Sequence, residues 1–288
     1  MTPWTSFTLA VLLSGLLVIA GCNRSPSSST ETQASSVEQQ DAVPVPPDLK
    51  VTVTDLVQAV ETLDIPKILA AYADDFMSGA GRPKESLRET LAQLQKNHVK
   101  VHVEKTDFEQ ATDEEAKLRT QIRLRYTDTF RDLGEGEVLV TDVLRHSLRK
   151  EDEHWYIYKD QRVAMYREGR FGERSANVQV EAPVQIPSAP DYTVTISVQR
   201  ESDKTYQVMV TNYLEDPGFL PPPDIVTELP EQGPLTITLT HNPQGRGEMV
   251  RVTVITEDSL GNWVGATTVS KYVPGLSTEE GDEAQLDT

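Results

Sequence analysis

Two adjacent carboxylates, Asp74 and Asp75, are the residues of this chain whose type and spacing best suit acid–base chemistry. Paired carboxylates can share such work when burial separates their pKa values. Neighbouring positions on a helix face different directions, so we expect this pair to serve the structure. Tyr72, on the same expected helix, is a candidate ligand-binding residue. Its alternative role is that of a core aromatic residue beside Ile68 and Phe76.

Arginine side chains supply a second candidate site. Arg119 and Arg123 lie on one face of an expected strand, together with Arg125, and could hold an anionic ligand or a partner. The alternative is that this row is the solvated face of a half-buried sheet. No Ser/His/Asp grouping, phosphate loop or Gly-x-Ser-x-Gly motif can be assembled. We therefore assign no catalytic residue and expect no cofactor.

The histidines do not predict a metal site. His98 and His102 have the spacing of four residues that can bind zinc on a helix. Their segment alternates like a strand, however, which would hold them about 13 Å apart at roughly 3.3 Å per residue. The chain has 1 cysteine, so a disulfide or a metal site built from several cysteines is excluded.

That cysteine, Cys22, follows an apolar run that ends in Ile19-Ala20-Gly21. This order resembles the lipobox of bacterial lipoproteins, in which the chain is cut before the cysteine and its sulfur is lipidated. The resemblance implies a signal peptide over residues 1–21 and a diacylglyceryl group on Cys22, often with a third acyl chain such as palmitate on the new amine. Two or more chains hold a protein stably on a membrane. The alternative is a plain membrane anchor that ends in Gly-Cys.

The flanking composition suits display from a membrane. Residues 22–48 are rich in Ser, Gln, Glu and Pro and are expected to be a disordered tether, and residues 275–288 a disordered acidic tail. The net charge of −18 argues against a nucleic-acid partner. Asn23 after the lipidated residue is compatible, under the enterobacterial sorting rule, with the outer membrane facing the periplasm rather than with the inner membrane.

Residues 49–162 predict an α+β domain. Apolar side chains first recur at helix spacing in three segments, and the period then changes to two, as in Val99, Val101 and Val103. We expect Thr54 to cap the first helix, and Asp64 to open a second helix that continues through Phe76. Three helices followed by a meandering, largely antiparallel sheet define this fold class.

A family resemblance supports this fold. The run Ala59–Phe76, a third helix after a glycine-containing break, and the closing residues His154–Ile157 resemble the nuclear transport factor 2-like superfamily, which includes ketosteroid isomerases and polyketide cyclases. The resemblance implies a curved sheet wrapped around helices as a cone with a pocket. Ketosteroid isomerases use an Asp base, a Tyr and a protonated Asp. Here Tyr72 lies on an element of the right kind, but the face on which Asp142 lies cannot be assigned.

The C-terminal part predicts an all-β domain at residues 191–274, after a linker at residues 163–190. Short alternating strands predict a β-sandwich, and the turn Asp258–Asn262 resembles one in bacterial immunoglobulin-like domains. A proline-framed loop carries Phe219 and Leu220, a candidate partner contact unless both pack against the sandwich. The expected strands are Tyr192–Gln199, Thr205–Thr211, Leu235–Thr240, Met249–Glu257 and Trp263–Tyr272.

Together these features favour a lipid-anchored protein of the bacterial cell envelope that works without catalysis. It would be a binding or assembly module for an envelope protein partner or for an apolar or anionic ligand. One alternative is an isomerase- or cyclase-like enzyme that uses the cone, with Tyr72 and an inward carboxylate. A second alternative is a structural spacer.

Overall fold

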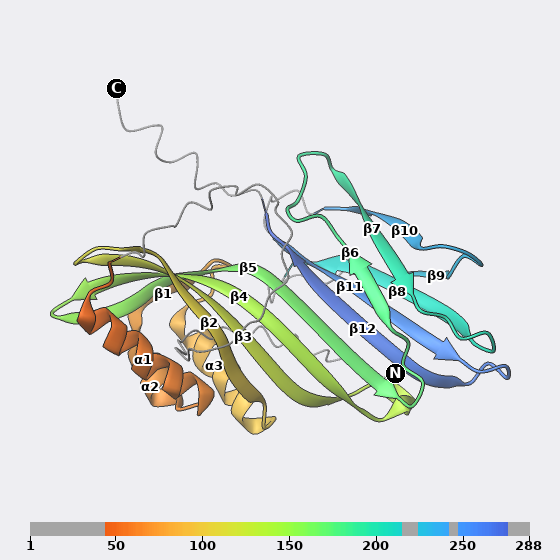
Figure 1. The fold of residues 1–288 in the computed structure, drawn as a ribbon, viewed down its shortest axis with the longest axis horizontal. Coiled ribbons are helices and arrows are strands. Elements are labelled where there is room, and N and C mark those ends of the chain that lie inside the picture. The colour runs from red at the N-terminus through yellow and green to blue at the C-terminus, as the bar shows by residue number, and fades with distance from the viewer. Residues whose placement is uncertain (1–43, 215–223, 242–246, 276–288) are drawn as a thin grey trace, which may run out of the picture.

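The computed structural model describes residues 44–214, 224–241 and 247–275. In these ranges three α-helices lie against one end of a large curved β-sheet, and a small β-sheet lies against its other end (Figure 1). Several predictions fall outside the described residues: the signal peptide predicted at residues 1–21, Cys22, the loop with Phe219 and Leu220, and the tail predicted after residue 275. No helix of the described ranges is long and apolar enough to span a membrane.

The helical elements are α1 (Pro47–Glu61), α2 (Ile65–Ala70), α3 (Lys84–Lys96) and the short 3-10 helix η1 (Arg131–Leu133). The strands are β1 (Tyr72–Ser78), β2 (Lys100–Ala111), β3 (Glu115–Thr129), β4 (Glu135–Glu151), β5 (His154–Gly172), β6 (Val178–Glu181), β7 (Asp191–Val198), β8 (Thr205–Tyr213), β9 (Ile225–Glu228), β10 (Leu235–Thr240), β11 (Glu248–Glu257) and β12 (Trp263–Val273). Five of them, β7, β8, β10, β11 and β12, match the predicted strands within two residues at each end.

The N-terminal helix begins earlier than predicted. Proline is favoured in the first turn of a helix, and α1 starts at Pro47. Thr54 is therefore not a cap but lies within α1, where its hydroxyl donates to the Lys50 carbonyl (2.7 Å). Trp155 Nε1 and Lys150 Nζ both bind the Asp48 carboxylate (3.0 and 2.8 Å), so the start of α1 is tied to the β4–β5 hairpin. These bonds lower the pKa of Asp48 to about 2.

The second helix is capped as predicted but is shorter. The Asp64 side chain accepts from the Lys67 amide, and α2 then ends at Ala70. Tyr72–Phe76, which we predicted to be helical, form the strand β1 instead, paired in parallel with β5. A spacing of four residues places side chains on one face of either a helix or a strand. The buried rings of Tyr72 and Phe76, with centroids 4.8 Å apart, fit both patterns.

One sheet runs through both halves of the described chain. Its strand order is β2-β3-β4-β5-β12-β11-β8-β9, and β1 pairs with β5 outside this path. The prediction of a linker from residue 163 is therefore wrong for residues 163–172, which form the second half of β5 and pair with β12, and for β6. Charged residues of this segment are in ion pairs within the sheet, including Arg167 with Asp128 and Arg170 with Glu168.

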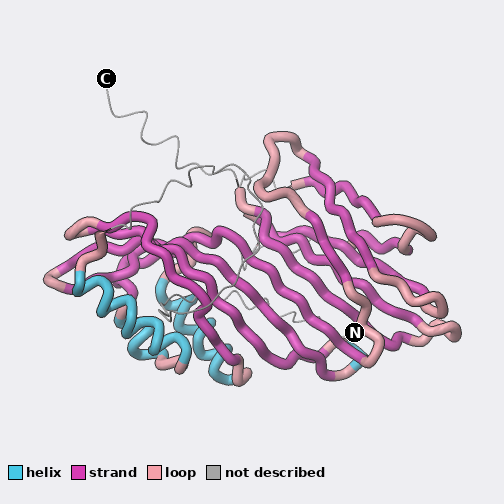
Figure 2. Tube along the Cα trace, viewed as in Figure 1, coloured by secondary structure: helices cyan, strands magenta, loops and turns pink. Residues whose placement is uncertain are grey.

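The helices and the small sheet cover opposite faces of this large sheet (Figure 2). Residues directly opposite one another on paired strands share a face, whereas successive residues alternate. Val140 packs in the helix-side core and is opposite Arg167, which is in turn opposite Ser270. The neighbouring Val269 packs instead against the small sheet, whose order is β10-β7-β6. The described helices thus lie over β2–β5 on one side, and the small sheet lies over β12, β11 and β8 on the other.

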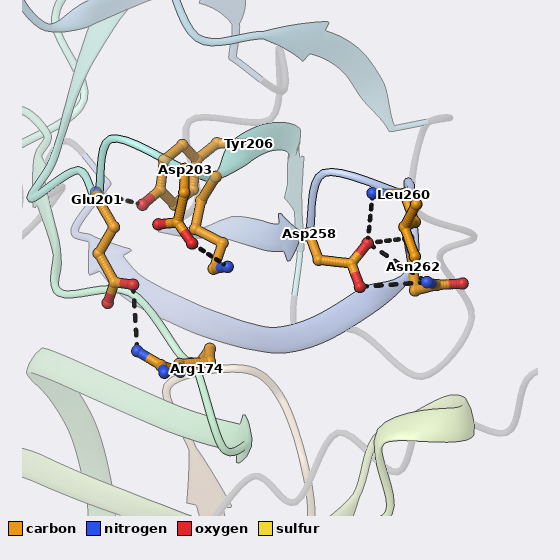
Figure 3. A network of polar contacts seen from close by, with 8 residues as sticks. Arg174, Glu201, Asp203, Tyr206, Asp258, Leu260 and Asn262 are labelled. Carbon is orange, nitrogen blue, oxygen red and sulfur yellow. Dashed lines mark hydrogen bonds and ion pairs between the residues drawn. The ribbon is translucent and has the colours of Figure 1, made fainter.

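Polar contacts close one end of the C-terminal half (Figure 3). The turn between β11 and β12 is capped by Asp258, whose carboxylate accepts from the amides of Leu260 and Asn262 (both 2.9 Å). These donors, first of all Asn262, lower the pKa of Asp258. Arg174, just after β5, contacts Glu201 (3.4 Å), so the end of β5 is linked to the connection between β7 and β8.

We expect substitution of Gly265, where β12 meets the end of β5, to destabilise the fold. A Cβ at this position would lie 2.3 Å from the backbone carbonyl of Arg174 and 2.5 Å from the Ser175 amide. Gly265→Ala should therefore lower the free energy of unfolding by about 1–3 kcal/mol, as overpacking does elsewhere. Urea denaturation measures the change. Ser259→Ala, in the exposed β11–β12 turn, is the control and should stay near wild type. Equal midpoints for the two variants would contradict the close approach.

Candidate functional site

Polar side chains occupy inward positions on three central strands of the helix-covered face. Strand β4 points Val138, Val140, Leu144 and Leu148 into the core, and Asp142 and His146 lie among them at the same alternation. Thr120 is opposite Leu144, while Asp160 and Arg162 on β5 are opposite His146 and Leu144. We call these five residues the inner polar cluster: Thr120, Asp142, His146, Asp160 and Arg162.

An irregularity of β5 helps to form this cluster. The register between β4 and β5 shifts between Val143 and Leu144, whose partners are Ala164 and Arg162. Val163 is therefore an extra residue in β5, as in a β-bulge, which re-aims the side chains beside it. As a result Arg162 and Met165 both face inward on either side of the bulge, next to Asp142.

The central contact of the cluster is a buried ion pair. Arg162 Nε and an Nη atom each donate to a different oxygen of Asp142, both at 2.9 Å. The two side chains are 8% and 1% exposed. A bidentate pair of this kind is geometrically specific and strong, but each charge depends on the other because water is excluded. The positive charge of Arg162 and the negative charge of Asp142 therefore balance each other in the core.

His146 is a neutral member of the cluster. It is fully buried, and burial lowers the pKa of its imidazole to about 3. Its Nε2 lies 3.1 Å from the Thr120 hydroxyl, which can donate to or accept from a neutral ring. His146 is therefore uncharged at neutral pH and contributes hydrogen bonding rather than charge.

Asp160 is the member best suited to move a proton. It is 1% exposed, and burial raises the pKa of its carboxyl to about 7, with nearby Asp142 adding to the shift and Arg162 opposing it. Its Oδ2 is buried without a hydrogen-bond partner in the described part of the chain. Such a group can exchange a proton near neutral pH, which is the property that general acids and bases need.

The residues proposed from the sequence lie elsewhere. Asp74 and Asp75 point outward, where Lys84 contacts the first (3.0 Å) and Arg149 binds the second through two bonds (2.7 and 3.1 Å). Both contacts are surface ion pairs, and the contact with Arg149 lowers the pKa of Asp75. His98 follows α3 in a turn, whereas His102 lies in β2, 2.8 Å from Glu61.

Tyr72 and the two candidate arginines are not brought together. Tyr72 is buried in the helix-side core, 1% exposed. Arg119 and Arg123 are exposed on the other face of β3, where Arg123 contacts Glu104 (2.6 Å). Further arginines of this outer face are also paired with carboxylates, for example Arg145 with Glu109.

The inner polar cluster carried a signal in the sequence that we did not use. Asp142 and His146 interrupt an apolar alternation in β4, and a polar residue at an inward position needs a buried partner. Asp160 and Arg162 could not be placed in the same way, because the bulge in β5 breaks the period of two. Their partners became identifiable only once the pairing of β4 with β5 was known.

Comparisons with known proteins describe part of the chain. No family model and no curated protein matches it. Among solved structures, Bd1075 of Bdellovibrio bacteriovorus is 20% identical with a TM-score of 0.33, and the match covers 40% of each chain, less than half of that protein. An NTF2-like protein of unknown function from Pseudomonas putida KT2440 is 18% identical over 40% of this chain and 82% of its own, with a TM-score of 0.29.

A third such structure is Aln2 from a Streptomyces species. It is 14% identical over 41% of this chain and 93% of its own length, with a TM-score of 0.32. The protein from Pseudomonas putida is described as NTF2-like, which is the superfamily that residues 49–162 resemble. With identities of 20% or less and TM-scores near 0.3, these likenesses assign neither an activity nor a ligand to this chain.

Proposed function

We propose that this protein is a lipid-anchored binding module of the bacterial cell envelope, displayed from a membrane through Cys22, and that it acts without catalysis. Its N-terminal half would be a nuclear transport factor 2-like domain, and its C-terminal half an immunoglobulin-like sandwich. The outer membrane, facing the periplasm, is the proposed location. An envelope protein or an anionic ligand is the proposed partner.

The observation that carries the binding role is the continuity of the large sheet. Because β5 pairs with β4 in its first part and with β12 in its second, both halves contribute to one face. A face built in this way is preorganised, which lowers the entropic cost of binding. The buried charges of Asp142 and Arg162 are paired with each other. This arrangement suits a stable scaffold better than it suits a pair of catalytic groups.

The anchor is tested by replacing Cys22. Cys22→Ser should leave the protein unlipidated, remove the mass of the acyl groups, and shift the chain from the membrane fraction to the soluble fraction, because the anchoring chains are lost. Mass spectrometry and membrane fractionation measure both effects. Ser14→Ala, within the apolar run before Cys22, is the control and should be processed normally. Unchanged mass and membrane retention of Cys22→Ser would sink the anchored role.

One observation favours an enzyme as the second candidate. Asp160 has a buried carboxyl with a pKa of about 7 and an unpartnered Oδ2 among the described residues, close to a cationic Arg162. An enzyme would use Asp160 for proton transfer, and Asp160→Asn would remove that function. A binding module would tolerate this change. Restoration of a deletion strain by the Asp160→Asn gene, to the same extent as by the wild-type gene, would therefore favour the binding role.

A further inference from the structure

We infer that the shared sheet face holds a site for an anion that carries a flat ring, an aryl phosphate or aryl carboxylate, between Arg167 of β5 and Arg251 of β11. This inference rests on the proposed binding function and names the chemical class of the ligand. The site lies where the two halves meet and is separate from the inner polar cluster.

The two arginines and two hydroxyl residues form one row across four neighbouring strands. Arg167 is opposite Ser270, Ser270 is opposite Arg251, and Arg251 is opposite Thr211. Paired strands lie about 4.8 Å apart, so the Cα atoms of the two arginines are separated by about 10 Å. The small Ser270 lies between two long cationic side chains, with its hydroxyl on the same face. Ser270 and Thr211 are themselves buried, 4% and 2% exposed, so an oxyanion would bind the more exposed guanidinium groups of the two arginines above them.

The two arginines are partly exposed, and their carboxylate partners lie farther away than in the buried Asp142–Arg162 pair. Arg167 contacts Asp128 at 3.2 Å and Arg251 contacts Asp224 at 3.6 Å, both longer than the 2.9 Å bonds that Arg162 makes. Their side chains are 24% and 29% exposed. Arg167 Nε is buried without a hydrogen-bond partner among the described residues. A buried donor without a partner is costly, and an anionic oxygen is the acceptor that satisfies it best.

Tyrosines line the same region. The guanidinium of Arg167 lies 5.8 Å from the ring centre of Tyr126, and that of Arg251 lies 5.7 Å from the ring centre of Tyr213. Tyr272, two residues after Ser270 and therefore on the same face, lies 5.8 Å from Arg162. Rings and guanidinium planes offer stacking surfaces to an aromatic group.

The curvature of the sheet brings these tyrosines together. Burial raises the pKa of Tyr126, and Tyr213 is near enough to add to the shift. Yet β3 and β8 are separated by β4, β5, β12 and β11 in the strand order. The large sheet is curved (Figure 1), and Tyr126 and Tyr213 each lie beside one arginine of the row. Cationic groups at the base and aromatic groups at the sides fit a ligand with an anionic end and a flat ring.

The test is calorimetric titration of the full chain in detergent at low salt, with phenyl phosphate, benzoate and inorganic phosphate as separate probes. We expect saturable binding of phenyl phosphate or benzoate, the stronger of the two identifying the anion, and weaker binding of inorganic phosphate because it lacks the ring. Arg167→Gln and Arg251→Gln should each weaken the bound aryl probe about ten-fold, the usual loss for a charged hydrogen bond. Arg167→Lys keeps the charge without Nε–H and should also weaken binding.

Arg125→Gln is the matched control, because Arg125 is an exposed arginine of the outer face paired with Glu137. It should bind the probe like wild type. No saturable binding of either aryl probe, or an equal loss in Arg125→Gln, would overturn the site. Thermal unfolding of each variant shows whether it is folded. If Arg167→Gln is unfolded, Arg167→Lys replaces it in the binding test. Membrane fractionation of the same variants separates the outcomes, since loss of the anion site leaves anchoring through Cys22 unchanged.

Discussion

Arg162→Met is expected to lower the free energy of unfolding by about 3–5 kcal/mol, the cost of stranding one charge of a buried ion pair. Asp142 is 1% exposed and would keep its carboxylate in the core without its bidentate partner. Asp160, whose carboxyl already has a raised pKa, lies close by and would add repulsion on ionisation. Urea denaturation at pH 7 measures the change.

Two further variants make this result specific. Arg145→Met removes a bidentate pair with Glu109 on the outer face, where both side chains are more than a quarter exposed, and should cost about 1 kcal/mol or less. Adding Asp142→Leu to Arg162→Met should recover most of the loss, because no unpaired charge then remains. Similar losses for Arg162→Met and Arg145→Met would show that the buried pair is not the source.

Asp160→Asn is expected to stabilise the protein above pH 7 by a few kcal/mol and to leave it near wild type at pH 4. In the folded protein the Asp160 pKa is about 7, well above the ordinary 3.8, so the native state binds this proton more tightly than the unfolded state. Asp160 therefore lowers stability as the pH rises from about 4 to about 7, by up to roughly 1.4 kcal/mol per pH unit. Asparagine resembles the protonated acid and removes this loss.

His146 has the opposite effect on the pH dependence. Burial holds its folded pKa at about 3, below the ordinary 6.5, so the unfolded state binds this proton more tightly. His146 thus raises stability as the pH rises from about 3 to about 6.5. In wild type the two contributions largely cancel between about pH 4 and pH 6.5.

Each single substitution should expose the contribution of the other residue. Asp160→Asn should give a stability that rises with pH over this window, and His146→Gln a stability that falls. Urea denaturation of both variants and of wild type at half-unit pH steps measures the slopes. A gain from Asp160→Asn that is the same at pH 4 and pH 8 would contradict the raised pKa of Asp160.

Local periodicity predicted most of the elements. In α3 the spacing of Leu87, Leu91 and Leu94 predicted a helix, and all three side chains are buried. In the same way, the alternation of apolar and polar residues in β3 predicted a strand. Periodicity failed at Tyr72–Phe76, because a spacing of four satisfies both periods and only the pairing with β5 decides between them.

The architecture depended on contacts that periodicity does not contain. Tyr166 pairs with Lys271, about a hundred residues away, and nothing near Tyr166 in the chain marks it as a strand with that partner. The segment was predicted to be a linker because its strand partners, β4 and β12, lie elsewhere in the chain. The candidate site was missed for the same reason, since Arg162 becomes a buried pair only when β4 supplies Asp142.

The central position of β12 has a consequence for how the chain matures. β12 is the last described strand in the chain, yet it lies between β5 and β11 in the sheet. Until residues 263–273 are synthesised, the second half of β5 lacks a neighbour on that side, and an unpaired strand edge invites association with other chains. Pairing across so long a loop is also slow. A growing chain therefore depends on residues 263–273 to protect β5, and truncation before β12 should produce aggregation rather than a shorter folded protein.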